Sequence, residues 1–463
     1  MAEKRRKYPL GIQTFSRLIR EGYVYVDKTD LVWQMANEDN PFLFLARPRR
    51  FGKSLLASTL HSFFAGEREL FRGLKAEQLE WDWQQYPVLH FDLSTAKHLA
   101  AEEVKKVLGI QLKLMEEEYG RDEEDTTPGM RLYGLVHRAH KQTSKQVVVI
   151  VDEYDAPLLD VLHEDEGLKA MRDVLQEFYQ NLKALEPLIK CCFITGITKF
   201  SQLSIFSTIN NISIISMLPK YAALCGITEQ ELTTTLAPDI ALLAREYECT
   251  PEEMHRRLKE RYDGYMFSER SPEIYNPFSL FKAFSTQKVT NYWFESGTPT
   301  FLIRQMQKFN TDITSLNDLE VSASAFDKPT EAMTTALPLL YQSGYLTLKS
   351  YDREFNTYIL GFPNREVEQG FIKYLVPFYM PKSQEKSRFS VAQFVKDVRG
   401  GDAEGFMRRL EAFFANGDYQ VMGDTEKYFQ NTLYVFFRLL GFYVDVERHT
   451  TDGRMDILLQ TPD

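Results

Sequence analysis

The sequence predicts an α/β fold with a doubly wound parallel sheet. Short apolar runs in the first half are bounded by polar turns, as expected of strands that are buried on both faces. Segments with helical periodicity separate these runs and are long enough to cross over between parallel strands. The predicted strands are residues 42–45, 88–91, 147–151, 191–195 and 212–215, and the predicted crossover helices are residues 54–64, 102–119 and 168–185.

Composition indicates an ordered protein of several domains. A chain of 463 residues is too long for one compact core, and its 44% hydrophobic and 26% charged residues are ordinary globular fractions. The 55 basic and 65 acidic side chains give a net charge of −10, so contact with nucleic acid would require a local basic surface. No segment reaches the roughly 18 apolar residues of a membrane span. The cysteines show no metal-ligand spacing, which favours a reduced, cytoplasmic protein; they are Cys191, Cys192, Cys225 and Cys249.

A phosphate-binding loop is predicted between the first strand and the first crossover helix. Residues 47–54 read Arg-Pro-Arg-Arg-Phe-Gly-Lys-Ser, which matches the Walker A motif except that Arg47 replaces its first glycine. Lys53 would neutralise phosphate charge, and the Ser54 hydroxyl would bind Mg²⁺. The alternative is a basic turn before a helix, in which Arg49 and Arg50 simply face solvent. The predicted nucleotide-binding residues are Arg47, Pro48, Arg49, Arg50, Phe51, Gly52, Lys53, Ser54 and Leu55.

Acidic residues follow the apolar run at residues 147–151, in the pattern of a Walker B motif. Asp152 is expected to hold Mg²⁺, and Glu153 to orient the attacking water, because the carboxyl ends of parallel strands border the ligand crevice. A strand that ends in a solvated acidic turn is the alternative. Thr195 ends a neighbouring predicted strand, where it either senses the γ-phosphate or caps a turn before Gly196. Lys53, Glu153 and Thr195 are the predicted catalytic residues, with Ser54 and Asp152 on the metal.

Several further strings make the chain resemble the bacterial AAA-ATPase-like proteins that carry a C-terminal PD-(D/E)XK nuclease-like domain. The loop at 47–55 is the most specific of them. The others are residues 8–15 (Tyr-Pro-Leu-Gly-Ile-Gln-Thr-Phe), 25–29 (Tyr-Val-Asp-Lys-Thr), 152–157 (Asp-Glu-Tyr-Asp-Ala-Pro), 195–196 (Thr-Gly), 262–265 (Tyr-Asp-Gly-Tyr) and 275–279 (Tyr-Asn-Pro-Phe-Ser). The resemblance covers nearly the whole chain.

The resemblance implies a P-loop ATPase core of the additional-strand, catalytic-glutamate type that binds ATP and Mg²⁺. We expect this AAA-like core at residues 1–218, a helical lid at 219–320, a winged-helix-like unit at 321–382 and a truncated nuclease-like α/β tail at 388–463. In the lid, short helices between residues 229 and 265 should break at Pro238 and Pro251. In the next unit, a helix at 331–342 precedes strands at 345–350 and 358–362. The segment 11–28 is a candidate for the adenine side through Ile12 and Phe15, and the equal alternative is that both are core residues.

The tail carries part of a nuclease pattern. Helices are predicted at residues 391–398, 405–415 and 427–440, after a linker at 382–388, and strands at 441–446 and 453–459. By resemblance, Glu426 and Asp456 match the first two metal-binding carboxylates, while the Glu-x-Lys strand that should follow lies beyond Asp463. We therefore expect the chain as given to lack nuclease activity and to keep at most a remnant site, through a natural or an artificial shortening. Taken alone, Asp456 is a structural acidic residue at a strand start.

Three functions compete at this point. The first is an ATPase whose nucleotide state controls the C-terminal unit. The second is a non-catalytic DNA- or RNA-binding protein with a vestigial P-loop, using Lys349, Arg353, Arg365 and Lys373, although these cations are mixed with acidic residues as on a solvated face. The third is a nucleotide kinase, but the Asp152–Glu153 pair and the expected lid favour hydrolysis instead. Oligomerisation is left open.

Overall fold

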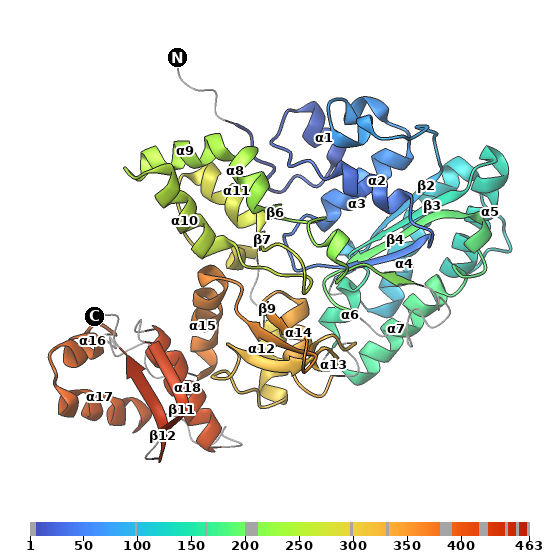
Figure 1. The fold of residues 1–463 in the computed structure, drawn as a ribbon. Helices are drawn as coiled ribbons and strands as arrows, with labels where there is room; N and C mark the ends of the chain where they lie inside the picture. Colours follow the sequence, from blue (N-terminus) through green and yellow to red (C-terminus); the bar gives the residue numbers. More distant parts are fainter. Residues whose placement is uncertain are drawn as a thin grey trace.

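The structure is a computed structural model that describes residues 6–97, 100–162, 164–199, 212–296, 300–329, 333–379, 391–415, 425–439, 443–450 and 453–460. The chain runs from a sheet with helices on both faces, through a helical segment and a small antiparallel sheet, to a tail at the far end (Figure 1). The order of these parts follows the order of the sequence.

A five-stranded parallel sheet forms the first part, as predicted. Its strands are β1 (Phe42–Ala46), β2 (Val88–Asp92), β3 (Val147–Asp152), β4 (Ile189–Gly196) and β5 (Ser213–Ile214), in the spatial order β2-β3-β4-β1-β5. β4 lies between β1 and β3, so it is the additional strand that the resemblance implied. Its register pairs Gly196 with Ala46 and Ile194 with Val151, and Asp92 pairs with Asp152 across β2 and β3. The carboxyl ends of these strands therefore meet at one edge.

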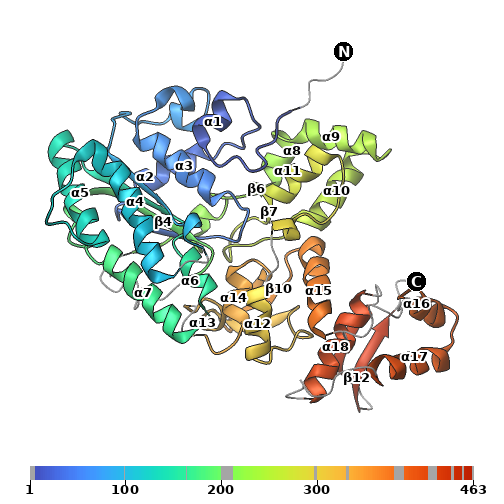
Figure 2. The same ribbon diagram turned by 180° about the vertical axis from the view of Figure 1, so that it is seen from behind.

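Helices cover both faces of the sheet. One group packs together on one face and a second group on the other (Figures 1 and 2). The first comprises α1 (Phe15–Arg20), α2 (Thr29–Ala36) and α3 (Lys53–Phe64); the second comprises α4 (Ala101–Tyr119), α5 (Pro128–Thr143) and α7 (Asp165–Tyr179), with the short α6 (Ala156–Asp160) beside it. The sheet residues and the inward faces of these helices form one apolar core. Single-turn helices in this part are η1 (Arg68–Phe71), η2 (Lys75–Gln78), η3 (Ser94–Ala96), η4 (Glu186–Leu188) and η5 (Pro219–Tyr221).

Two predictions for this part were wrong in detail. The sequence analysis did not predict α5, which begins at Pro128 with the Thr127 side chain accepting from the Met130 N–H. Proline is well placed at this helix start, because an N–H in the first turn has no helical partner in any case. The helix predicted at 168–185 ends at Tyr179 and is followed by turns up to η4.

We call residues 227–286 the lid segment. It comprises β6 (Ile227–Thr228), α8 (Glu229–Thr234), α9 (Ala237–Glu246), α10 (Pro251–Tyr262), β7 (Ile274–Tyr275) and α11 (Pro277–Thr286), around an apolar core of its own. The predicted run of short helices is confirmed. Pro238 and Pro251 lie in the first turns of α9 and α10, so each marks a helix start.

We call residues 319–379 the winged-helix-like unit. It comprises β8 (Leu319–Ser322), α13 (Ala323–Phe326), α14 (Leu337–Gln342), β9 (Thr347–Asp352), β10 (Thr357–Gly361) and α15 (Arg365–Tyr379), preceded by η6 (Trp293–Ser296) and α12 (Thr300–Lys308). The β9–β10 hairpin was predicted, and β8 extends it to a three-stranded antiparallel sheet. The helix predicted at 331–342 is shorter in the structure, because α14 begins at Leu337 with a proline in its first turn. Residues 330–332 lie outside the described part.

The tail contains α16 (Val391–Arg399), α17 (Ala403–Ala415), α18 (Thr425–Leu439), β11 (Tyr443–Thr450) and β12 (Gly453–Gln460). β11 and β12 pair antiparallel, with Val446 opposite Ile457. The predicted linker at 382–388 lies outside the described residues. Among the helices that the structure describes, none combines the length and the apolar character needed to cross a membrane.

Candidate functional site

The loop between β1 and α3 has the backbone shape of a phosphate-binding loop. Gly52 caps the N-terminus of α3 with a φ of +93°, in the left-handed region that favours glycine. A Cβ atom at Gly52 would meet nothing within 4 Å, so backbone conformation rather than packing requires glycine here. Arg50 also has a positive φ, of +67°, which ordinary side chains rarely adopt. The first N–H groups of α3 have no partner within the helix, so this end of α3 can bind an anion.

Lys53 is buried inside its own loop. Its Nζ donates to the carbonyl oxygens of Arg47 at 3.1 Å and Pro48 at 3.2 Å. Burial lowers the pKa of Lys53, while the nearby carboxylates of Glu153 and Asp152 act in the opposite direction. A cation held by two neutral carbonyls is poorly compensated, and phosphate oxygens would compensate it better.

Asp152 and Ser54 bring two oxygen ligands together at the edge of the sheet. Asp152 ends β3 with 4% exposure, and burial raises its pKa to about 6, although the adjacent Ser54 side chain opposes the rise. Its Oδ1 also accepts the Glu153 N–H at 2.9 Å. Carboxylate and hydroxyl oxygens suit Mg²⁺, and a cation here would favour the charged form of the buried carboxyl. The residues present therefore fit the metal.

Glu153 is engaged in an ion pair at the edge of the sheet. Its φ is +49°, and its Oε2 lies 2.6 Å from Nζ of Lys97, which follows η3 just after β2. No sequence motif predicted Lys97 as part of this site. Its position just after β2 could have predicted it, because β2 is parallel to β3 and the segments after both strands leave from the same edge of the sheet.

Asp155 is a second residue that the sequence analysis missed. It is 1% exposed and accepts hydrogen bonds from the backbone N–H groups of Ile197 and Thr198 and from the Thr198 hydroxyl, at 3.0, 2.7 and 2.7 Å. Asp155 thereby fixes the segment after β3 to the segment after β4. The Thr195 hydroxyl donates to the Leu45 carbonyl at 2.8 Å, so in this structure it joins β4 to β1 and its phosphate role stays a prediction.

The remaining loop residues divide between solvent and the interior. Arg49 is exposed. Arg47 is 1% exposed, and its guanidinium donates to the carbonyls of Ala46, Ser216 and Tyr221 at 3.0, 2.7 and 3.1 Å. The structure thus directs Arg47 into backbone contacts within the protein. Burial lowers its pKa to about 10.

An apolar cavity of about 90 Å³ opens beside Gly52 and Leu55. The N-terminal segment contributes Val24 and Tyr25 to its wall, and the lid segment contributes Phe281. The prediction that the N-terminal segment borders this side agrees with the lining, but Phe15 packs in the core against Tyr25 and Phe71 at ring distances of 5.4 and 5.0 Å, and neither it nor Ile12 lines the cavity.

The N-terminal strings of the sequence fasten the cavity wall to the lid segment. Tyr8 donates its hydroxyl to Asp239 at 2.7 Å, and Nζ of Lys28 lies 2.6 Å from Oε2 of Glu231. Glu231 also caps the first turn of α8 by accepting from the Thr228 N–H at 2.8 Å. Tyr8 and Lys28 therefore have a structural role in the sequence segments 8–15 and 25–29, where they bind the lid segment.

Comparison with known proteins agrees with this geometry. The family described as "Predicted AAA-ATPase" matches residues 9–206, and the PD-(D/E)XK nuclease superfamily matches residues 424–463. A protein of Azotobacter chroococcum mcd 1, described as an uncharacterized protein in the vnfD 5' region, is 34% identical over 469 residues, covering 98% of this chain and 87% of that protein. The chain belongs to the AAA-ATPase-like family.

Two solved structures from Aeropyrum pernix match this chain at low scores. The ORC1 protein in complex with DNA has a TM-score of 0.27 and 12% identity, covering 78% of this chain and 98% of that chain. The ORC2 protein, in ADPNP and ADP complexes, has a TM-score of 0.24 and 10% identity, covering 78% and 96%. At these scores no conclusion about this AAA-ATPase-like chain rests on either.

The second site expected of this AAA-ATPase-like chain lies in the tail. Glu426 lies on α18 and Asp456 on β12, but their side chains lie outside what the structure describes. Among the described residues, no group of three or more His, Cys, Asp or Glu side chains could hold a metal ion. A P-loop magnesium site does not need such a group, because phosphate oxygens and water complete the coordination.

Proposed function

We propose that this chain is a Mg²⁺-dependent ATPase whose nucleotide state controls its C-terminal nuclease-like unit. The observation that carries the proposal is the position of the Ser54 side chain beside the buried Asp152 carboxyl, whose pKa it lowers, directly after the buried Lys53 at the N-terminus of α3. Two residues about a hundred positions apart in sequence meet there with the chemistry of a metal–phosphate site. The alternative of a basic turn gives no reason for this meeting.

The roles of the side chains follow from their positions. Lys53 would exchange its two carbonyl partners for β- and γ-phosphate oxygens, and Ser54 and Asp152 would hold Mg²⁺, which neutralises the phosphate charge. The apolar cavity beside Leu55 would take the base. Glu153 must leave Lys97 before it can orient a water molecule, so the ion pair describes a resting state.

Wider parts of the proposal rest on the family matches. The proposed units are residues 1–218, 219–320, 321–382 and 388–463, as the sequence analysis expects. The match at residues 424–463 supports contact of the C-terminal half with DNA or RNA. The vestigial P-loop alternative is less favoured, because two of its four cations are engaged within the chain. Lys349 donates to the Pro363 carbonyl at 3.0 Å, and Arg365 lies 3.2 Å from Glu260. A cytoplasmic location is proposed from the cysteine pattern alone.

The proposal is tested by MgATP binding and turnover in wild type, Lys53→Ala and Glu153→Gln, each with and without DNA. We expect Lys53→Ala to lose about 100-fold in affinity, the scale of a charged hydrogen-bonding group that is removed from its partner. Glu153→Gln should bind MgATP and fail to hydrolyse it. Wild-type affinity in Lys53→Ala, or a wild type that neither binds nor hydrolyses ATP, would overturn the proposal.

A further inference from the structure

The large side chains of the P-loop contact the lid segment. The Phe51 ring lies 4.8 Å from the Tyr265 ring and 5.4 Å from the Phe267 ring, both in edge-to-face geometry. The Arg47 guanidinium lies 4.1 Å from the centre of the same Phe267 ring, and Arg50 lies 3.6 Å from that of Phe278. Arg47, Arg50 and Phe51 therefore connect this loop to the lid segment.

The same loop also contacts the winged-helix-like unit. A Cβ atom at Gly344 would lie 2.6 Å from Cβ and Cγ of Pro48, closer than real contacts allow. Only glycine fits at this point, where the loop lies against the turn between α14 and β9. Arg47, Phe267 and Gln342 also line a second, small cavity of about 40 Å³ between the loop and this unit.

Lys53 connects these contacts to the phosphate position. In the structure its Nζ bonds the carbonyls of Arg47 and Pro48, the two residues that contact Phe267 and Gly344. Phosphate binding would draw Nζ from those carbonyls, because charged acceptors form the stronger bonds. The backbone at Arg47 and Pro48 would then lose two hydrogen bonds. Phosphate binding would therefore change how firmly these two residues are held against Phe267 and Gly344.

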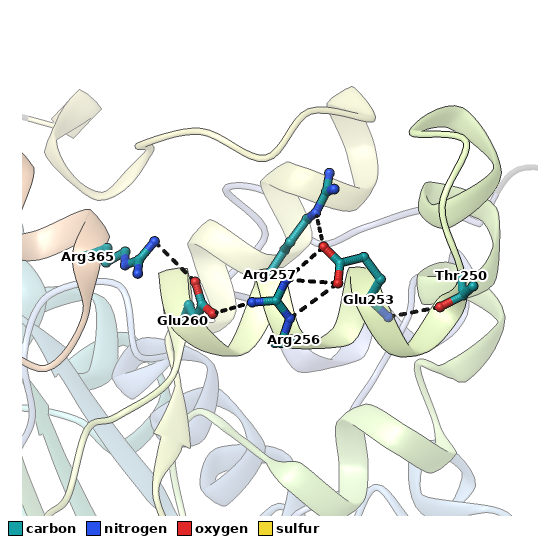
Figure 3. A network of polar contacts seen from close by, with 6 residues as sticks. All are labelled: Thr250, Glu253, Arg256, Arg257, Glu260 and Arg365. Atoms are coloured by element: carbon teal, nitrogen blue, oxygen red, sulfur yellow. Dashed lines mark hydrogen bonds and ion pairs between the residues drawn. The ribbon is translucent and has the colours of Figure 1, made fainter. Parts of the chain in front are cut away.

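The lid segment and the winged-helix-like unit are joined by buried and surface bonds. Asn364 Nδ2 donates to the Asp263 carbonyl at 2.7 Å, and the Met266 N–H donates to the Thr347 hydroxyl at 2.9 Å. A Cβ atom at Gly264 would lie 2.1 Å from the Pro363 carbonyl oxygen. On the surface, Arg365 at the start of α15 joins a network of charged side chains along α10 (Figure 3).

Helix α15 extends from this junction to the tail. In its first turn, Glu366 accepts the N–H groups of Tyr292 and Trp293 at 2.5 and 3.1 Å. Glu368, on the same helix, pairs with Arg438 of α18, and the two helices pack together. Helix α18 is the element that carries Glu426. A continuous set of packed contacts thus runs from the P-loop to the nuclease-like tail.

We propose that Arg47 and Phe51 are positioning residues that transmit phosphate occupancy from Lys53 to the lid segment, and through α15 to α18. The proposal rests on the proposed ATP site and adds how that site acts on the tail. Phe267 is its central contact, because the Arg47 guanidinium and the Phe51 ring both lie against the Phe267 ring. Replacement of the loop's first glycine by arginine is then a functional feature, since a glycine could make none of these contacts.

Hydrogen exchange of the full chain, with and without Mg²⁺ and a non-hydrolysable ATP analogue, tests the proposal when affinity for the analogue is measured in parallel. In wild type we expect the analogue to change exchange in residues 337–379 and 425–439. Phe267→Leu and Arg47→Lys should bind the analogue yet lose that change. Phe267→Tyr, which keeps the ring, should restore it. Phe355→Leu is the matched control, because Phe355 is 69% exposed at the tip of the β9–β10 hairpin and should leave binding and response unchanged.

The outcomes separate this inference from the proposed function. Binding without any change in α15 and α18, or a full change in both Phe267→Leu and Arg47→Lys, overturns the inference and leaves the ATP site standing. A wild type that does not bind the analogue overturns both. Phe267→Leu leaves the P-loop sequence intact, so the test stands even where Arg47→Lys fails to fold.

Discussion

The two faces of the P-loop differ in what they contact. Gly52 and Leu55 border the apolar cavity beside the N-terminal segment, and Lys53 and Ser54 stand next to the acidic end of β3. Arg47 and Pro48 border the other cavity and contact the lid segment and the winged-helix-like unit. One face of this short loop can therefore bind the ligand, while the other passes the effect of binding to the lid segment and the winged-helix-like unit. Substitutions on the first face should change binding, and those on the second should change what binding does.

The largest effect is expected from Ser54→Ala on the ligand face. Removal of the hydroxyl deletes a metal ligand, so the gain in ATP affinity that Mg²⁺ gives should fall by about 10- to 100-fold. Titration of ATP with and without Mg²⁺ measures this. Ser58→Ala is the control, because Ser58 lies one turn further along α3 and accepts the Phe15 N–H. Equal dependence on Mg²⁺ in wild type and Ser54→Ala would contradict the metal role.

A smaller effect is expected from Phe281→Ala at the base cavity. Phe281 lines the cavity at 8% exposure, so its loss should weaken ATP binding by roughly 1–2 kcal/mol, or about tenfold. Binding of inorganic tripolyphosphate should not change, because that ligand has no base. Phe284→Ala on the same helix is the control, since Phe284 is buried in the lid core and does not line the cavity. Equal losses for ATP and tripolyphosphate would place the base elsewhere.

A pH-dependent change in stability is expected from Glu366→Gln on the transmission side. Burial raises the pKa of Glu366 to about 7, so the folded protein holds a proton that the unfolded chain releases near its ordinary value of 4.5. The stabilisation from the protonated form is complete below that ordinary value and is lost as pH rises through about 7. Melting temperatures from pH 5 to 8 should therefore fall less in Glu366→Gln than in wild type. Parallel curves would show that Glu366 does not titrate in this range.

The smallest effect is expected from Glu260→Ala. Glu260 pairs with Arg365 between α10 and α15 at 3.2 Å, but 36% of its side chain and 63% of that of Arg365 are exposed (Figure 3). Exposed pairs contribute about 0–1 kcal/mol, so the melting temperature should barely move and the exchange response of α15 should persist. Loss of the exchange response in this variant would show that the Glu260–Arg365 ion pair, and not the bonds of Asn364 and Met266, connects the lid segment to α15.

The sequence predicted what depends on local pattern. Apolar runs separated by helical segments predicted each strand of the parallel sheet. The motif residues Gly52, Lys53 and Ser54 were placed correctly between the first strand and its helix. It could not predict contacts between distant segments. Arg47 was expected to bind nucleotide, but its guanidinium contacts carbonyls that lie 169 and 174 residues away. Lys97 was missed for the same reason, because only the parallel pairing of β2 with β3 brings it to Glu153.

A crystal structure of the full chain with Mg²⁺ and a non-hydrolysable ATP analogue tests the central claim most directly. The account predicts phosphates at the N-terminus of α3 with Nζ of Lys53 moved onto them, and Mg²⁺ next to Ser54 and Asp152. It also predicts the base in the cavity beside Leu55. A nucleotide bound elsewhere, or phosphates at α3 with Nζ still on the carbonyls of Arg47 and Pro48, would contradict it.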